Sequence, residues 1–187
     1  MPLTPWKKVK EEILHANPWW TYKRDQVLRH DDSHGEYHYV ETPGSVMVIP
    51  RTAEGEFLLV RQYRHLNQRE SIEFPAGGVK AGQSWDAAAR AELREEAGTT
   101  ATTLTLIGSF NPFNGVTNEI CRVYAASGLA AVAAQPDPSE QFEVLVLTET
   151  DIHALIAAGE LWDGMSLAAW SLYRNTQFGA QFVRGDE

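Results

Sequence analysis

Apolar and polar residues alternate along many short stretches of this chain, and turn residues separate the stretches. Alternation with a period of two is typical of β-strands that bury one face. Two clear turn signals, Asp-Asp-Ser-His-Gly at 31–35 and Ala-Glu-Gly at 53–55, lie between such stretches. The pattern predicts strands at residues 20–29, 37–42, 45–49, 57–62, 71–74, 103–109, 119–126 and 144–147.

A helix is predicted between Ser84 and Gly98, directly after a glycine-rich loop. Ser84 is a suitable N-cap, Asp86 suits the positive end of the helix dipole, and Gly98 is a suitable stop. The residues between them are mostly Ala, Leu, Arg and Glu, which are good helix formers. Two further helices are predicted at 151–158 and 166–173.

The first sixteen residues allow two interpretations. Thr4-Pro5 suits a helix start, and Trp6, Val9 and Ile13 have roughly helical spacing. A short strand near Ile13 is the alternative, and the sequence leaves both open.

Composition and charge narrow the classes of function. The chain has 187 residues, 43% of them hydrophobic, and a net charge of −9. Proteins that bind nucleic acid or membrane surfaces need a basic surface, so we expect neither partner. No apolar stretch is long enough to span a bilayer, and the N-terminus lacks a signal-peptide apolar region. The single cysteine, Cys121, rules out an internal disulfide, so we expect a reducing, cytoplasmic location.

Three carboxylates lie on one face of the predicted helix after Ser84. Glu92, Glu95 and Glu96 fall within an arc of roughly 100°. Their mutual repulsion is relieved by a hard cation such as Mg²⁺, which prefers oxygen ligands. A solvated acidic face is the alternative, and the helix alone favours that interpretation because such glutamate pairs are ordinary on exposed helices.

The flanking residues favour the metal instead. Residues 77–99 resemble the Nudix box, Gly-x5-Glu-x7-Arg-Glu-U-x-Glu-Glu-x-Gly-U, in which U is aliphatic. The matching residues are Gly77, Glu92, Leu93, Glu95, Glu96 and Gly98. The chain departs from the box at three positions, Gln83, Ala91 and Thr99. The arginine replaced by Ala91 normally helps to orient the glutamates, so its loss bears on catalytic efficiency.

The resemblance extends beyond the box, over most of residues 17–175. The motifs Asn-Pro-Trp, Arg-Gln-Tyr-Arg, Glu-Phe-Pro-Ala-Gly-Gly and Gly-Glu-Leu-Trp-Asp-Gly are similar to those of the ADP-ribose pyrophosphatase branch. This implies an α/β (α+β) fold, an α/β/α sandwich with a mixed sheet, preceded by a small N-terminal antiparallel β-domain. Residues 1–43 would be an N-terminal β-hairpin and dimerisation region, and 44–180 the Nudix hydrolase domain.

The resemblance also implies an activity and a partner. Members of this branch cleave ADP-ribose to AMP and ribose 5-phosphate with Mg²⁺, and Mn²⁺ is a possible substitute. The expected assembly is a homodimer.

Site residues follow from the resemblance by motif position. The Ala76 carbonyl, Glu92 and Glu96 would hold the metal, and Glu95 would be a ligand or a base. Glu140 would be a base or a metal ligand. Arg64 and Glu73 would face the substrate. Trp20 or Tyr39 would stack on adenine. The alternative for these two aromatic residues is a contact in the core or in the dimer interface.

Two other functions remain open. The enzyme could act on another nucleotide sugar such as GDP-mannose, on a dinucleotide or on a nucleoside triphosphate. Alternatively, the chain could be a catalytically weak Nudix domain that senses nucleotides. Gln83 and Ala91 favour the sensing role, and the intact glutamates argue against it.

Overall fold

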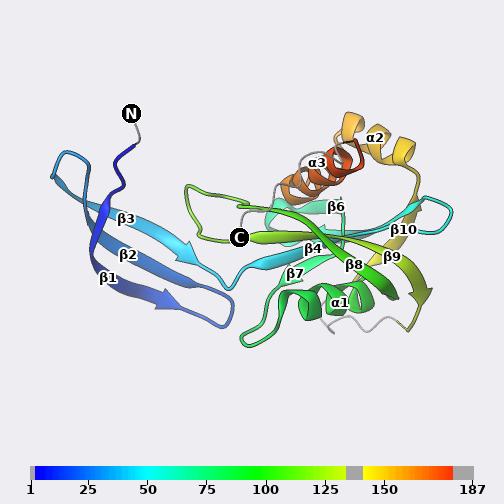
Figure 1. Ribbon diagram of the computed structural model, residues 1–187, viewed down its shortest axis with the longest axis horizontal. Helices are drawn as coiled ribbons and strands as arrows, with labels where there is room; N and C mark the ends of the chain where they lie inside the picture. Colours follow the sequence, from blue (N-terminus) through cyan, green and yellow to red (C-terminus); the bar gives the residue numbers. More distant parts are fainter. Residues whose placement is uncertain (1–2, 134–140, 179–187) are drawn as a thin grey trace. The chain divides into compact units, whose positions relative to one another are not determined.

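The computed structural model describes residues 3–133 and 141–178, and the chain divides into two units (Figure 1). The first, which we call the β unit, consists of Met1–Gly44 and Asn111–Ile120. The second, the layered unit, consists of Ser45–Phe110 and Cys121–Glu187. Within the described residues, no helix combines the length and the apolar character that crossing a bilayer requires.

The β unit is built on an antiparallel sheet of three strands in the order β1-β2-β3. The strands are β1 (Lys7–Ala16), β2 (Thr21–Leu28) and β3 (His34–Glu41). The segment 111–120 joins this unit beside β3, through a parallel bridge between Val40 and Thr117.

The segment Lys7–Ala16 therefore forms a strand and not a helix. β1 is ten residues long and pairs with β2 along its length. Opposite charges face each other across this pairing: Arg24 lies 2.7 Å from Glu12, and Lys23 lies 3.0 Å from Glu11. Cross-strand pairs of opposite charge stabilise a sheet, and this long-range term overrides the helical spacing of the few apolar residues.

Two sheets form the centre of the layered unit. The first, in the order β7-β4-β9-β8, is mixed, because β4 and β9 run parallel and the other pairs antiparallel. Its strands are β4 (Ser45–Pro50), β7 (Ala76–Gly78), β8 (Thr99–Phe110) and β9 (Cys121–Ala131). The second sheet is antiparallel, in the order β10-β5-β6, with β5 (Phe57–Arg64), β6 (Arg69–Glu73) and β10 (Glu143–Leu147).

Helices cover the two sheets from opposite sides (Figure 1). They are α1 (Trp85–Glu95), α2 (Glu149–Ala158) and α3 (Gly164–Phe178), and a short 3-10 turn, η1 (His65–Asn67), follows β5. β4 shows how the layers are built, because its successive side chains point to opposite faces. Val46 and Val48 pack with α1, whereas Met47 and Ile49 pack in the core shared with α2 and α3.

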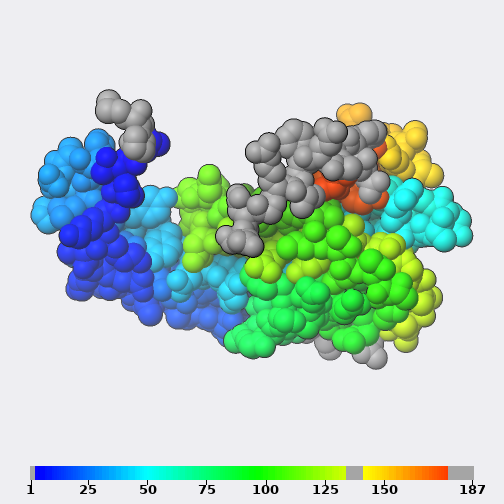
Figure 2. All heavy atoms as spheres, viewed as in Figure 1, coloured from blue at the N-terminus to red at the C-terminus, as the bar shows by residue number. Residues whose placement is uncertain are grey.

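The structure confirms the expected fold class. It is an α/β/α arrangement around a mixed sheet, together with a small antiparallel N-terminal sheet. In the space-filling view, α1 and β8, coloured green, form a continuous surface of the layered unit (Figure 2).

Candidate active site

The box helix α1 begins and packs as its sequence predicts. Ser84 has an extended backbone, and its hydroxyl accepts a hydrogen bond from the Ala87 N–H at 3.2 Å. Ala89 and Leu93 are fully buried in the core beneath the mixed sheet. This packing fixes the rotation of α1 about its axis, and with it the direction of the glutamates on the neighbouring face.

Glu96 is tied to β7, the short strand at the start of the box. It is the C-cap residue of α1 and only 6% exposed. Its Oε2 accepts a hydrogen bond from the backbone N–H of Ala76 at 3.0 Å. The end of α1 is therefore fixed to β7 through this carboxylate.

Glu92 lies against Gly77, the second residue of β7. A Cβ atom built on Gly77 would come within 2.2 Å of Glu92 Oε1 and 2.4 Å of its Cδ. No real side chain fits at such distances, so the carboxylate occupies space that only a glycine leaves open. A Cβ on Gly78, in contrast, would meet no heavy atom of the described residues within 4 Å.

Glu95 and the two arginines of α1 point elsewhere. The Glu95 side chain is 30% exposed and lies 3.8 Å from Arg94 Nη2. Arg90 donates a hydrogen bond from Nη1 to the Ala101 carbonyl at 2.8 Å, which links α1 to β8. Of the two arginines next to Ala91, Arg90 thus binds β8 and Arg94 lies near Glu95.

Arg64, at the end of β5, is paired with Glu73 on β6. Arg64 Nε donates to Glu73 Oε1 at 2.7 Å, and Arg64 Nη2 pairs with Oε2. The Glu73 side chain is 2% exposed, whereas that of Arg64 is 45% exposed. Glu73 raises the pKa of Arg64, and the charges of Asp163 and Glu96 raise it further, so Arg64 lies within electrostatic range of the box helix.

Two residues at the start of α3, Asp163 and Ser166, hold the segment between β6 and β7, and they are not among the site residues predicted from the sequence. Ser166 is fully buried, and its Oγ accepts a hydrogen bond from the Phe74 N–H at 3.1 Å. Asp163 in turn accepts from the Ser166 N–H at 2.7 Å. The capping pattern Asp163-x-x-Ser166 is a helix-start signal that could have been found. The contact with Phe74 spans 92 residues and has no local signal.

The oxygen atoms gathered where the end of α1 meets β7 fit a divalent cation. Glu92, Glu96 and the Ala76 carbonyl all offer oxygen ligands, which Mg²⁺ and Mn²⁺ prefer. Within residues 3–133 and 141–178, no three Asp, Glu, His or Cys side chains gather closely enough to hold a metal alone. An ion at this site would therefore complete its shell with backbone, substrate or water oxygens. Glu140 lies outside the described residues.

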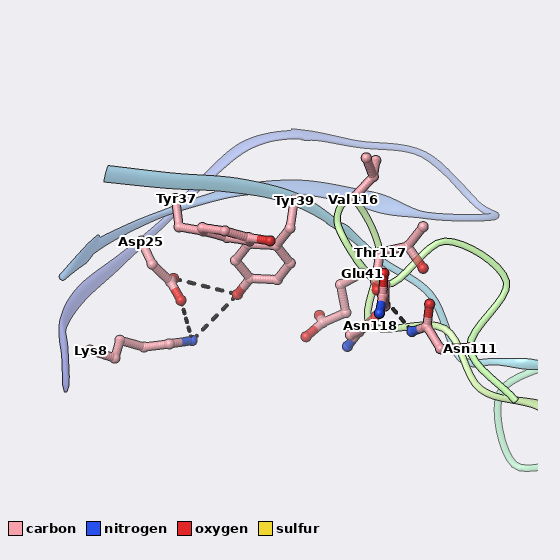
Figure 3. Close-up of a pocket in the computed structure, with 10 residues that line it drawn as sticks. Lys8, Asp25, Tyr37, Tyr39, Glu41, Asn111, Val116, Thr117 and Asn118 are labelled. Carbon is pink, nitrogen blue, oxygen red and sulfur yellow. Dashed lines mark hydrogen bonds and ion pairs between the residues drawn. The ribbon is translucent and has the colours of Figure 1, made fainter. Parts of the chain in front are cut away.

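The aromatic residues expected at the substrate lie in the β unit. A cavity of about 540 Å³ lies there, and Tyr39 is one of its lining residues. Figure 3 shows how these residues lie. The Tyr39 hydroxyl, Lys8 and the Asp25 carboxylate meet at one side of the cavity, with Lys8 Nζ 2.8 Å from Asp25 Oδ2. Trp20 is not among the described residues that line the cavity; it is 39% exposed, and its ring centroid lies 5.6 Å from that of His15.

Comparisons with known proteins agree with the fold and with the box. The family profile described as NUDIX domain matches residues 41–166. The ADP-ribose pyrophosphatase of Bacillus subtilis is 34% identical over 162 residues, which cover 86% of this chain and 87% of that protein. The methanol dehydrogenase activator of Bacillus methanolicus is 28% identical over 165 residues, covering 87% of this chain and 89% of that protein.

A solved structure supports the same fold. The crystal structure of an ADP compounds hydrolase superposes with a TM-score of 0.83 at 19% sequence identity, covering 98% of this chain and all of that one. Profile, relatives and fold agree with the box geometry at Ala76, Gly77, Glu92 and Glu96. The chain therefore belongs to the NUDIX family, as a Nudix pyrophosphohydrolase, which confirms the family that residues 77–99 predicted.

Proposed function

We propose that this enzyme hydrolyses the pyrophosphate bond of ADP-ribose or a related nucleoside diphosphate sugar, giving AMP and ribose 5-phosphate in the first case. The observation that carries the proposal is the strand β7, whose Ala76 holds Glu96 by a hydrogen bond and whose Gly77 accommodates Glu92. The names of the Bacillus subtilis and Mycobacterium tuberculosis relatives, both ADP-ribose pyrophosphatases, support the choice of substrate.

The cofactor in this proposal is Mg²⁺, with Mn²⁺ as a possible substitute. Glu92, Glu96 and the Ala76 carbonyl would hold it, with Glu95 as a further ligand or a base. When bound, such an ion neutralises phosphate oxygens and lowers the pKa of a bound water. Arg64 would donate to a phosphate oxygen, because a guanidinium matches phosphate geometry.

The general base in this proposal is Glu95 or Glu140. A base must reach the attacking water by a hydrogen bond, directly or through one water. Glu95 is partly exposed next to Arg94, which is compatible with such access. Steady-state kinetics of Glu95→Gln and Glu140→Gln distinguish them, since the base variant is expected to lose roughly 10²–10⁴-fold in kcat.

The adenine would be bound by aromatic residues of the β unit. Tyr39 is the stronger candidate because it lines the 540 Å³ cavity, and Trp20 is the second because it is partly exposed. Stacking of a base on an aromatic ring contributes about 1–3 kcal/mol. Tyr39→Ala and Trp20→Ala are each compared with the wild type by KM. The stacking residue is the one whose loss raises KM for ADP-ribose more than for a ribosyl diphosphate substrate that lacks adenine.

We also propose a homodimer. The β unit exposes several large apolar side chains, and exposed apolar patches often mark protein–protein interaction sites. They include Trp6, Val9, Ile13, Leu14, Trp19 and Trp20. A two-fold dimer is the commonest assembly that covers such a surface.

Product analysis on a substrate panel tests the function. ADP-ribose, GDP-mannose, a dinucleotide and a nucleoside triphosphate are each incubated with the enzyme and Mg²⁺, and the products are separated by chromatography. AMP and ribose 5-phosphate from ADP-ribose at the highest kcat/KM are the expected result. Faster cleavage of another member of the panel would reassign the substrate, and binding without cleavage of any would favour a nucleotide sensor.

A further inference from the structure

Glu73 is a carboxylate that the layered unit buries almost completely. An ionised carboxylate is costly to bury unless it is paired and hydrogen-bonded. Arg64 supplies Nε and Nη2 to its two oxygens, and Gln62 Nε2 donates to Oε2 at 3.4 Å. These donors engage both oxygens of Glu73 from the protein side. A buried carboxylate so engaged is poorly placed to bind a ligand itself.

Among the described residues, Glu73 binds Arg64 along one edge of its guanidinium. A guanidinium presents five N–H groups in a rigid plane, and the contact with Glu73 uses Nε and Nη2. The side chain is still 45% exposed, and it senses the charges of Glu96 and Asp163. Arg64 is therefore fixed on its buried side and accessible on the other, in the same charged neighbourhood as the box helix.

We propose that Glu73 is a positioning residue that fixes Arg64 for the diphosphate of the substrate. An arginine without such an anchor samples many rotamers, and ordering it on binding weakens affinity. Glu73 holds the guanidinium in one orientation before the substrate binds, and Gln62 assists by donating a hydrogen bond to the Glu73 carboxylate. The proposal rests on the proposed function, because it takes a diphosphate as the ligand of Arg64.

A double-mutant cycle tests whether Glu73 acts through Arg64. Glu73→Gln keeps the shape of the side chain and removes its charge. We expect kcat/KM for ADP-ribose to fall by about 10- to 100-fold, mostly through KM, the scale on which a misplaced positioning group acts. In an Arg64→Lys background the same change should cost less than about twofold, because no guanidinium fork remains to be positioned. Equal losses in both backgrounds would mean that Glu73 contacts the substrate itself, and would overturn the proposal.

A matched control removes a similar ion pair from the same sheet. Glu143 on β10 lies 2.9 Å from Arg61 Nη1 on β5, but its side chain is 60% exposed. Glu143→Gln therefore removes a carboxylate–arginine pair whose carboxylate is exposed and not buried. We expect its kcat/KM to equal that of the wild type. A loss as large as that of Glu73→Gln would indicate a general effect on the sheet and would overturn the specific role.

A measurement without substrate separates this proposal from the proposed function. The Arg64 Nε–H is bonded to a buried oxygen, so its exchange with water, followed by side-chain NMR, should be slow in the wild type and fast in Glu73→Gln. Wild-type hydrolysis of ADP-ribose tests the function by itself. An active wild type whose Arg64 Nε–H exchanges equally in both proteins would overturn the positioning role alone.

If Glu73→Gln fails to fold, as judged by thermal unfolding, Glu73→Asp takes its place. Aspartate keeps the charge and withdraws the carboxylate by one methylene, so the anchor is displaced and not abolished. The expected result is a raised KM with kcat nearly unchanged, together with faster Nε–H exchange. Wild-type KM and exchange in Glu73→Asp would overturn the proposal.

Discussion

The carboxylates Glu92 and Glu96 are oriented by the backbone of one short strand, β7. Ala76 donates its N–H to Glu96, and Gly77 leaves the space that Glu92 occupies. In the Nudix box an arginine normally assists this orientation, and here Ala91 stands in its place. These contacts with Ala76 and Gly77 are a physical reason why the glutamates can remain ordered without that arginine.

Gly77→Ala is expected to displace Glu92, since the new Cβ would lie 2.2 Å from its Oε1. The Mg²⁺ concentration for half-maximal activity should rise by about 10- to 100-fold, the range for changes that disturb how metal ligands are held. Gly78→Ala is the matched control, because its Cβ meets no described atom within 4 Å. Mg²⁺ titrations of both variants decide the point, and equal titrations would contradict the role of Gly77.

Glu96→Gln is expected to nearly abolish turnover and to leave the fold intact. The amide oxygen of glutamine can still accept the hydrogen bond from the Ala76 N–H, so the end of α1 stays attached. The lost charge weakens metal binding by more than the roughly 10- to 100-fold seen when groups behind a metal ligand are removed. Steady-state kinetics at saturating Mg²⁺ and thermal unfolding are measured together.

A control for Glu96→Gln is Glu160→Gln, which changes an exposed glutamate just beyond α2. Its turnover should equal that of the wild type. Hydrolysis at the wild-type rate by Glu96→Gln would remove Glu96 from the proposed metal site.

At the residue scale, the sequence predicts the local structural role of a residue where that residue belongs to a known motif. Ser84 caps α1 as expected, and Gly98, with a φ of 55°, reverses the chain shortly after the helix. The contacts of Gln62 and Ser166 could not be predicted, because each depends on strands or helices that meet only in the folded chain. The roles of the site residues remain predictions that the kinetic experiments test.

At the scale of elements, period-two alternation located most strands, and the boundaries moved by a few residues. The predicted strand 103–109 is β8 (Thr99–Phe110), and the predicted helix 166–173 is α3 (Gly164–Phe178). The short strand β7 has two glycines and no alternation, so only its pairing with β4 defines it. β1 is ambiguous in the sequence because the partners of its backbone and of its charged side chains lie on β2, and such pairing leaves no local signal.

We expect the pairing of β1 with β2 to weaken at acid pH. Lys8, and to a smaller extent Lys23, lower the pKa of Glu11 from its ordinary value of 4.5 to about 2. A carboxyl group with a lowered pKa in the folded state stabilises that state above pH 4.5. This contribution is lost as the pH falls from about 4.5 to about 2. The β1 amides should lose protection from hydrogen exchange in this range.

Glu11→Gln is the control for this pH effect. The variant should show weaker protection of β1 at pH 6 and little further loss from Glu11 on acidification. High salt should narrow the difference from the wild type, because Glu11 and Lys8 are exposed enough to be screened. Identical acid profiles of the two proteins would contradict the role of this ion pair.

At the scale of the whole molecule, the sequence predicted a hairpin at the N-terminus followed by a layered domain. The β unit instead has three strands and recruits residues 111–120 from within the later sequence. The contacts between Val40 and Thr117 and between the Thr42 N–H and Asn118 Oδ1 establish this return of the chain. Such a discontinuous unit cannot be inferred from local patterns, because its segments are about 70 residues apart.

This discontinuity changes how the proposed dimer should be tested. Deleting residues 1–42 would remove the partners of 111–120, so a loss of activity would not be specific to dimerisation. A single charge on the exposed apolar surface of β1 is a cleaner change. Ile13 is 60% exposed, so Ile13→Asp should leave the chain folded in its monomeric form.

We expect the wild type to have the mass of two chains in light scattering at micromolar concentration, and Ile13→Asp to have the mass of one. An aspartate in the centre of an apolar interface would be desolvated without a partner, which opposes association. Val146→Asp is the matched control, since Val146 on β10 of the layered unit is 55% exposed, and its mass should equal that of the wild type. A wild-type monomer, or a dimer that Ile13→Asp leaves intact, would show that β1 is not the dimer surface.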